Sequence, residues 1–288
     1  MRVSSVGKRG VTLMDSQGEE HPARAAGRIF SSLPPVPGDI VVAADQGGTL
    51  LVEEIRPRRN TLTRSDRVGD SKPVAANIDL VVAVMAVAEP AFAPGLLDRI
   101  LAAAEWDRLS CLVVLNKTDL RSNDDPSLDE YRAAGYRCLE LSCVEGLGVS
   151  ELEGELTDRV VLMAGPSGAG KTSIARRLRP DLQFRVGSVS PRTSRGRHTT
   201  TSSRLIPLGH GTLLMDTPGI QGYSVEHIPA GGLGACFPEI ASLADHCRFR
   251  DCFHNREPGC AVRDAAENGR ISERRYESYI DLLKRAGG

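Results

Sequence analysis

A glycine-rich motif of eight residues constrains the fold of this chain more than any other feature. Residues 165–172 read Gly-Pro-Ser-Gly-Ala-Gly-Lys-Thr and match the pattern G-x-x-x-x-G-K-[ST] without a gap. The apolar run 159–164 predicts a buried strand before the motif, and a helix is expected to begin at its end. The backbone N–H groups of such a turn, together with the helix N-terminus, bind phosphate. We therefore predict an α/β domain that binds a nucleoside triphosphate.

The residues of this phosphate loop have different expected roles. Lys171 reaches the terminal phosphates and is one of two predicted catalytic residues, while the hydroxyl of Thr172 is predicted to bind Mg²⁺. The other predicted contacts to the nucleotide in this loop are Gly165, Ser167, Gly168, Ala169 and Gly170. The motif does not identify the base. Because its amino-acid sequence also resembles the phosphate loop of guanylate kinases, a phosphotransferase of that type is an alternative interpretation.

The sequence around the phosphate loop alternates between strand-like and helix-like segments. The expected strands are 78–88, 111–115, 137–141, 159–164 and 212–215, and the expected helices are 94–106, 128–134 and 149–156. Such alternation predicts βα units and a parallel sheet with helices on both faces. The 288 residues are 41% apolar and 25% charged, which is ordinary for a globular protein and enough for two domains.

A base-reading motif follows the expected strand 111–115. Residues Asn116-Lys117-Thr118-Asp119 match N-K-x-D, which reads guanine in GTPases. Asp119 would accept hydrogen bonds from N1 and the exocyclic amine of guanine, and adenine would leave this carboxylate unpaired. We expect Asn116 to brace the loop and the stem of Lys117 to cover the base. The alternative is a solvated turn made of common loop residues.

A second guanine-binding element is expected after the strand 137–141. Ser142-Cys143 resembles the Ser-Ala element whose backbone contacts guanine O6, with Cys in place of Ala. Because the contact uses the backbone, we expect both residues to contribute to base binding.

The segment after the strand 212–215 matches the switch motif D-x-x-G. Asp216 is predicted to bind Mg²⁺ through water, and the N–H of Gly219 is predicted to contact the γ-phosphate. The next residue is Ile220, where Ras-like enzymes carry a glutamine that orients water. An apolar side chain cannot orient water, so hydrolysis needs another group or a partner that supplies one.

The candidate for that group lies between the phosphate loop and D-x-x-G, in the segment 196–201. His198 is the second predicted catalytic residue, because an imidazole there could position or deprotonate the attacking water; a solvated surface histidine is the alternative. One threonine hydroxyl would close on Mg²⁺ and the γ-phosphate, and we favour Thr200 over Thr199. The surrounding segment contains arginines and no acidic residue between Asp181 and Asp216, so it would bind the nucleotide or RNA phosphate, or be a solvated loop.

A cysteine and histidine cluster lies near the C-terminus. Cys247, Cys252, His254 and Cys260 fall within 14 residues. Three thiolates and one imidazole form a closed tetrahedral Zn²⁺ site, and zinc would stabilise a segment with little apolar area of its own. The alternatives are free buried cysteines or a disulfide. Arginines in the expected helices 261–268 and 272–284 would contact RNA phosphates, or form a solvated, salt-bridged surface.

The N-terminal 68 residues have a different sequence pattern, in which short apolar runs are separated by Gly and Pro. This pattern predicts a small β-barrel, OB-like or SH3-like, or a meander. The polar segment 56–73 is interpreted as a linker. A net charge of −1 excludes a globally basic nucleic-acid binder. No apolar stretch approaches the roughly 20 residues of a membrane span, and the start has no apolar signal segment, so we expect a cytoplasmic protein without membrane contact.

The order of the motifs is that of a circularly permuted GTPase, because base reading precedes the phosphate loop and the switches follow it. From residue 56 to the end, the chain resembles the small-ribosomal-subunit-dependent GTPases of the RsgA or YjeQ family, on these motifs, on Asn77-Ile78-Asp79 and on the cysteine cluster. Pro166, Ala169 and Thr172 replace the commoner Gln, Val and Ser of that family.

The resemblance implies an OB-fold at 1–68, a permuted GTPase domain at 69–230 and a helical zinc domain at 231–288. It also implies GTP or GDP, Mg²⁺ and one structural Zn²⁺ as ligands. The implied function is hydrolysis of GTP to GDP and phosphate on the small ribosomal subunit and its rRNA, during late maturation. We expect a monomer. A further alternative is an RNA-binding chaperone that uses GTP only to set affinity.

Overall fold

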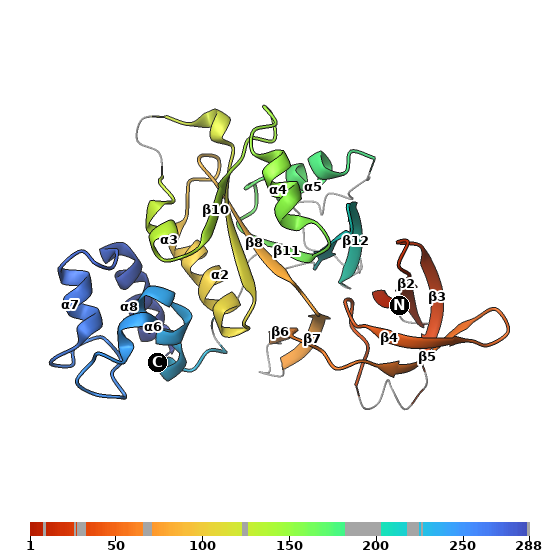
Figure 1. Ribbon diagram of the computed structural model, residues 1–288, viewed down its shortest axis with the longest axis horizontal. Coiled ribbons are helices and arrows are strands. Elements are labelled where there is room, and N and C mark those ends of the chain that lie inside the picture. Colours follow the sequence, from red (N-terminus) through yellow and green to blue (C-terminus); the bar gives the residue numbers. More distant parts are fainter. Residues whose placement is uncertain are drawn as a thin grey trace, which may run out of the picture. The chain divides into compact units, whose positions relative to one another are not determined.

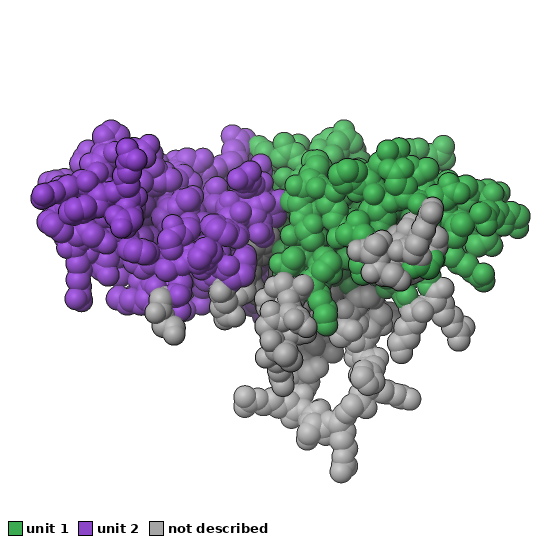
Figure 2. Space-filling view, turned by 90° about the horizontal axis from the view of Figure 1, so that it is seen from below, with its two compact units in different colours: residues 1–80, 153–163, 172–220 green, residues 81–152, 164–171, 221–288 purple. Residues whose placement is uncertain are grey.

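The protein is described by a computed structural model that covers residues 1–7, 10–25, 27, 33–65, 71–122, 126–181, 203–217, 225 and 227–286. The chain divides into two compact units, coloured in Figure 2. Unit 1 comprises residues 1–80, 153–163 and 172–220, and unit 2 comprises residues 81–152, 164–171 and 221–288. Both units are therefore built from segments that are distant in the sequence. The domain boundaries near residues 68 and 230 remain predictions.

The N-terminal part of unit 1 is a five-stranded barrel, which confirms the OB-like prediction. Its strands are β1 (Arg2–Gly7), β2 (Gly10–Met14), β3 (Glu20–Ala25), β4 (Val41–Asp45) and β5 (Leu50–Ile55). They follow one another in the order β1-β2-β3-β5-β4, with only the β3–β5 pair parallel. A bridge between Arg2 and Ile40, and a 3.0 Å hydrogen bond from Val41 N to Met1 O, join β4 back to β1. Alternating apolar side chains such as Val3, Leu13 and Val52 fill the interior.

The segment interpreted as a linker contains a two-stranded antiparallel ribbon, β6 (Thr61–Ser65) and β7 (Ser71–Ala76), so the linker interpretation is wrong there. Two of its polar residues, Arg58 and Asn60, are hydrogen-bonded to other parts of the fold. The guanidinium of Arg58 donates to both carboxylate oxygens of Asp39 at 2.7 and 2.8 Å, and the Asp39 side chain is fully buried. The side-chain amide of Asn60 donates to Ile78 O at 2.8 Å and accepts from Ile78 N at 2.9 Å, as a neighbouring strand would.

Asn77-Ile78-Asp79 fixes the turn at Gly38 and the start of β11 (Val160–Ala164). Gly38 has φ +97°, and a Cβ atom there would overlap the carbonyl oxygen of Ala76. The side-chain amide of Asn77 donates to Gly38 O at 3.0 Å, and the Asp79 carboxylate accepts from Val160 N at 2.8 Å. These two side chains thus connect the barrel to a strand of the α/β part of unit 1.

The rest of unit 1 carries the elements on either side of the phosphate loop. β11 pairs in parallel with β13 (Thr212–Asp216), which pairs antiparallel with β12 (Arg204–Gly209). The helices are α4 (Val149–Leu156), whose last four residues belong to this unit, and α5 (Lys171–Leu178), which belongs to it from Thr172 onward. Each of these elements lies where the sequence predicted a strand or helix, except that β12 was not predicted.

Unit 2 contains the strands and helices that position the base-reading motif. These elements are β8 (Leu80–Ala86), α2 (Pro94–Trp106), β9 (Ser110–Asn116), η1 (Thr118–Leu120), α3 (Asp129–Ala133) and β10 (Arg137–Glu140). β9 and β10 are parallel, and every residue of β8 is buried, as expected for a strand covered on both faces. The predicted helix 94–106 has the observed bounds, and Pro94 at its first turn fits the fixed φ of proline.

The C-terminal part of unit 2 is helical (Figure 1), and Ala102 of α2 belongs to its hydrophobic core. Its elements are η2 (Ala230–Cys236), α6 (Pro238–Ala244), α7 (Ala261–Glu267) and α8 (Glu273–Ala286). None of the helices in the described ranges has the length and apolar content needed to cross a membrane.

Two arginines of α8 bind carboxylates of three other helices. Arg275 is 1% exposed and pairs with Asp98 at 2.8 Å and with Glu239 at 2.6 Å. Arg274 pairs with Asp98 and with Glu130, both at 2.7 Å. Of the two alternatives predicted for these arginines, the structure shows salt bridges, although Arg275 is buried rather than solvated. These ion pairs hold the C-terminal helices to α2 and α3.

Candidate functional site

The phosphate loop leads from β11 into α5, as predicted. The ammonium of Lys171 donates to Gly165 O at 2.7 Å and to Pro166 O at 2.8 Å, and partial burial lowers its pKa. An ammonium has three N–H donors. Two bonds within the loop hold the lysine in place, and among the described residues the third donor stays available for a phosphate oxygen.

One contact joins the base-reading motif to the phosphate loop. Asn116, at the end of β9, is 2% exposed, and its side-chain amide donates to Ala169 O at 2.9 Å. The same amide lies against Gly170, which has φ +98° and whose Cβ atom would overlap the Asn116 amide nitrogen. The contact with Ala169 agrees with the bracing role predicted for Asn116. Gly170 is needed because a side chain there would overlap the Asn116 amide.

The oxygen of the same amide has no partner. Asn116 Oδ1 is buried and accepts no hydrogen bond from the described residues. An unsatisfied buried oxygen between the base-reading and phosphate motifs fits a site that a ligand completes. The unpaired Oδ1 of Asn116 therefore supports nucleotide binding independently of the sequence motifs.

The predicted guanine reader, Asp119, lies in η1 and is exposed. The hydroxyl of the buried Ser142 donates to Asp119 Oδ1 at 2.6 Å and accepts from Glu145 N at 3.1 Å. This fixes one carboxylate oxygen of Asp119, and no described residue donates a hydrogen bond to the other. The sequence predicted that the backbone of Ser142 contacts the base. It gave no indication that the Ser142 side chain also holds Asp119. The ammonium of Lys117 donates to Glu89 O, and Lys117 has φ +62°.

The remaining predicted nucleotide ligands are divided between the two units or lie outside the described residues. Ser167, Gly168 and Cys143 lie in unit 2, with Cys143 next to Ser142. Thr172 and Asp216 lie in unit 1, and both side chains are exposed. Arg204 Nε lies 3.5 Å from Asp216 Oδ2. His198, Thr199, Thr200 and Gly219 lie outside the described residues.

The cysteine and histidine cluster brings its four predicted ligands together. Cys247 Sγ lies 3.4 Å from His254 Nδ1 and 3.9 Å from Cys260 Sγ, and Cys260 Sγ lies 3.6 Å from His254 Nδ1. All four ligand atoms, including Cys252 Sγ, lie within 4.8 Å of one another. Tetrahedral bonds of about 2.3 Å to sulfur and 2.0 Å to nitrogen place ligand atoms about 3.5–3.8 Å apart. The set therefore fits Zn²⁺.

Residues around the cluster hold the ligands in position. Backbone N–H groups of His254 and Arg263 donate to Cys252 Sγ and Cys260 Sγ, each at 3.4 Å. The hydroxyl of Tyr276 donates to His254 O at 2.7 Å. Burial lowers the pKa of His254, which favours the neutral imidazole that a metal binds. The spacing of the ligands gave no signal for these supporting residues of α7 and α8.

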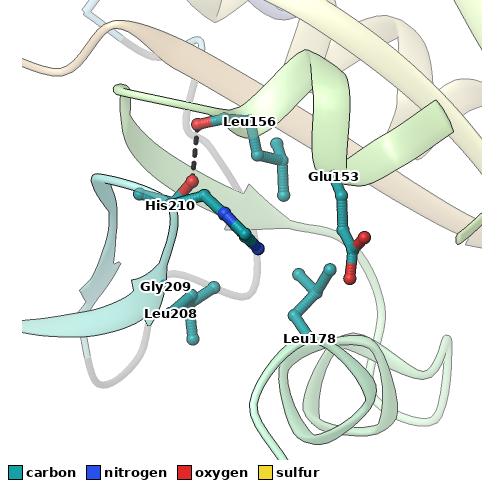
Figure 3. A pocket seen from close by; sticks show the side chains of 7 residues that line it. Glu153, Leu156, Leu178, Leu208, Gly209 and His210 are labelled. Carbon is teal, nitrogen blue, oxygen red and sulfur yellow. Dashed lines mark hydrogen bonds between the residues drawn. The ribbon is translucent and has the colours of Figure 1, made fainter. Parts of the chain in front are cut away.

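Two other features of the structure do not form part of the nucleotide site. A pocket in unit 1 between α4, α5 and the β12–β13 turn has a volume of about 10 Å³, room for about one water molecule. Figure 3 shows it, with the 2.8 Å hydrogen bond from the Thr212 hydroxyl to Leu156 O at its edge. Asp15, Glu19 and His21 form a second group of potential metal ligands in the barrel. The Asp15 carboxylate already accepts hydrogen bonds from the Gln17 and Glu19 backbone and contacts His21 at 2.8 Å.

Comparisons with known proteins agree with these features. The family model for the RsgA GTPase matches residues 55–226. The small ribosomal subunit biogenesis GTPase RsgA of Azotobacter vinelandii is 43% identical over 255 residues, which cover 86% of this chain and 74% of that protein. Its counterpart in Gemmatimonas aurantiaca is 40% identical over 278 residues, covering 92% and 90%.

Solved structures match over nearly the whole chain. YjeQ from Thermotoga maritima superposes with a TM-score of 0.83 at 31% identity, covering 100% of this chain and 98% of that one. YloQ, described as a circularly permuted GTPase, superposes with a TM-score of 0.79 at 26% identity, covering 99% and 94%. The permuted motif order of this chain therefore has a structural counterpart.

Proposed function

Because this chain belongs to the RsgA GTPase family, we propose that it binds the small ribosomal subunit and hydrolyses GTP to GDP and phosphate during late maturation of that subunit. The observation that most directly supports nucleotide binding is the contact of Asn116 with Ala169 and Gly170. It supports nucleotide binding because it joins the N-K-x-D motif to the G-x-x-x-x-G-K-[ST] motif, although 53 residues separate Asn116 from Ala169. The guanylate-kinase alternative does not account for this motif.

Guanine selection is assigned to Asp119 and its supports. The carboxylate would accept hydrogen bonds from guanine N1–H and the exocyclic amine, while Ser142 holds it by one oxygen. The backbone of Ser142 and Cys143 would contact guanine O6, and the stem of Lys117 would cover the base. Adenine would leave the carboxylate unpaired, so it would bind far more weakly.

Phosphate binding is assigned to Lys171 and to backbone N–H groups of the phosphate loop, those of Gly165, Ser167, Gly168, Ala169 and Gly170. Lys171 would exchange bonds within the loop for bonds to the terminal phosphates, where its charge stabilises the transferring phosphoryl group. The oxygens of Thr172 and Asp216, with Thr200 or Thr199 from the switch segment, would hold Mg²⁺. This ion supplies charge neutralisation at the β- and γ-phosphate oxygens.

Orientation of the attacking water is assigned to His198, because Ile220 stands where other GTPases carry glutamine. The histidine lies in an arginine-rich segment whose positive charges repel one another. We propose that this segment reaches its catalytic arrangement on the ribosomal subunit, which makes turnover depend on the partner.

The other parts of the chain are assigned to partner binding and structure. The barrel and the helical segment with one structural Zn²⁺ would flank the GTPase domain, with boundaries near residues 68 and 230. The partner is the small subunit and its rRNA. The protein would act as a cytoplasmic monomer, without membrane contact.

The test is GTP turnover by the purified protein, alone and with purified small ribosomal subunits. Slow turnover alone and at least about a hundredfold stimulation by subunits is the expected result, because a single stabilising group is worth about that factor in rate. Equal rates with and without subunits would contradict the ribosomal assignment. His198→Ala should bind GTP normally, lose stimulated turnover and remain on the subunit. Normal release of this variant would instead support a chaperone that uses GTP only to set affinity.

A further inference from the structure

Two phenylalanine rings are exposed on the loop that carries the zinc ligands. Phe249 is 41% exposed and Phe253 is 43% exposed, whereas Phe237, in the adjacent core, is 1% exposed. Both exposed rings lie within three residues of Cys252. Leaving aromatic area in water forgoes the stabilisation that burial provides. The stability of the fold therefore does not explain why these two rings are exposed.

The backbone that presents Phe253 is fixed on both sides. Its N–H donates to Glu257 Oε1 at 3.0 Å, and its carbonyl accepts from the Tyr279 hydroxyl at 2.7 Å. The adjacent residues, Cys252 and His254, belong to the four-ligand cluster. A ring on so constrained a backbone loses little conformational freedom when it binds a partner, which favours recognition.

Three arginines lie close in sequence to the two rings, together with the exposed acidic residues Asp245 and Asp251. The exposed side chains of Arg248, Arg250 and Arg256 form no ion pair with any described residue, and the Arg248 guanidinium lies 5.4 Å from the centre of the Phe249 ring. The nearby carboxylate of Glu257 accepts instead from the backbone N–H groups of Phe253, Asn255 and Arg256. This differs from α8, where Arg274 and Arg275 are both paired.

We propose that this surface, formed by Arg248, Phe249, Arg250, Phe253 and Arg256, binds unpaired RNA by stacking bases on the two rings and pairing phosphates with the three guanidinium groups. The inference rests on the proposed function, since the RNA would belong to the small ribosomal subunit. Unpaired rather than duplex RNA is specified because bases inside an A-form helix are already stacked on one another. Aromatic side chains with neighbouring arginines are the usual platform for single strands.

The test uses the full-length, zinc-loaded protein and two labelled probes, a single-stranded poly-uridine RNA and a duplex RNA of the same length. The variants are Phe253→Ala, Phe249→Ala, Phe253→Leu and Phe253→Tyr. Leucine keeps an apolar side chain without a ring, and tyrosine restores a stacking ring. Leu147→Ala is the matched control, because Leu147 is 56% exposed in unit 2 and outside the zinc loop. Zinc content is measured for every variant, so that a disrupted cluster is recognised.

The wild type should bind the single strand more tightly than the duplex. Each alanine variant, and Phe253→Leu, should weaken single-strand binding by at least about fivefold with zinc retained. Phe253→Tyr and Leu147→Ala should bind like the wild type. The proposal is overturned if the wild type does not prefer the single strand, or if Phe253→Leu binds the single strand like the wild type, which would show that RNA binding needs no stacking ring at this position.

The same variants separate this inference from the ribosomal assignment. If subunits stimulate GTP turnover of the wild type while Phe253→Ala binds the single strand normally, the inference fails and the proposed function stands. If subunits have no effect but single-strand binding depends on the two rings, the proposed function fails and the RNA surface stands.

Discussion

The cysteine cluster, which we propose binds zinc, and the region that we propose binds guanine (the guanine-binding region) are assembled from the sequence in opposite ways. Four potential metal ligands come from one stretch of 14 residues, and their atoms lie within 4.8 Å of one another. The guanine-binding region instead depends on contacts between distant segments, such as Asn116 with Ala169 and Asp119 with Ser142. Local spacing therefore determines the first, whereas the second exists only once β9, β10 and the phosphate loop have come together.

The difference has an energetic consequence. The ligands of the cysteine cluster are close in sequence, so a metal can bring them together with little help from distant segments. The guanine-binding region requires the packing of unit 2, within which Arg274 and Arg275 join the C-terminal helices to α2 and α3. Variants of the two regions should therefore fail in different ways.

The largest effect is expected from removing a metal ligand. Cys260→Ala should abolish zinc binding and unfold the segment around it, since structural zinc contributes on the order of 10 kcal/mol in small zinc modules. Metal analysis and limited proteolysis would measure this. Cys138→Ala, which removes a half-buried thiol outside the cluster, should leave both unchanged. Retained zinc in the Cys260 variant would show that the cluster is not the metal site.

A large loss of stability is expected from breaking the link between the two regions. Arg275→Met should lower the free energy of unfolding by about 3–5 kcal/mol, because it leaves the carboxylates of Asp98 and Glu239 partly unpaired in the interior. Chemical denaturation would measure this. Lys284→Met, on the same helix, removes only the exposed 3.3 Å pair with Asp281 and should change stability by about 0.5 kcal/mol or less. Similar values for the two variants would rule out a stabilising role for the buried network.

A smaller effect, confined to nucleotide binding, is expected at the base reader. Asp119→Asn should weaken GDP binding by at least about a hundredfold and favour xanthosine diphosphate, because the amide offers a donor where the carboxylate offered an acceptor. Titration with both nucleotides would measure this. Unchanged GDP affinity would remove Asp119 from the guanine site.

The smallest effect is expected from removing the support of that reader. Ser142→Ala deletes the 2.6 Å hydrogen bond to Asp119 and should weaken GDP binding by about tenfold, the value of one charge-assisted hydrogen bond. The same titration applies. Ser127→Ala, which removes an exposed hydroxyl bonded to Asp129 N, serves as the control and should bind GDP normally. Equal affinities of the two variants would show that Asp119 needs no such support.

The sequence predicted much of this structure because its strongest signals are local. The phosphate loop, the base-reading motif and the cysteine spacing each lie within 14 residues, and the helix 94–106 is marked by its proline and apolar spacing. The fold class, including the barrel, is confirmed.

The errors concern residues whose partners are distant. Arg274 was expected to meet RNA or nearby acids, but its partners Glu130 and Asp98 lie 144 and 176 residues away. Arg58 and Asn60 were interpreted as part of a linker because their partners, Asp39 and Ile78, are 19 and 18 residues away. The sequence pattern gives no indication of which buried carboxylate or backbone group an isolated polar residue will meet.

The measurement that most directly tests the central claim, a guanine-selective site built by long-range contacts, is the affinity of the purified wild-type protein for GDP and for ADP by calorimetry. A base held by the paired acceptors of a positioned carboxylate should be preferred by at least about a thousandfold over one that cannot pair with it. We expect GDP to bind with such a preference. Comparable affinities for the two nucleotides would contradict the account, because Asp119 would then not read the base.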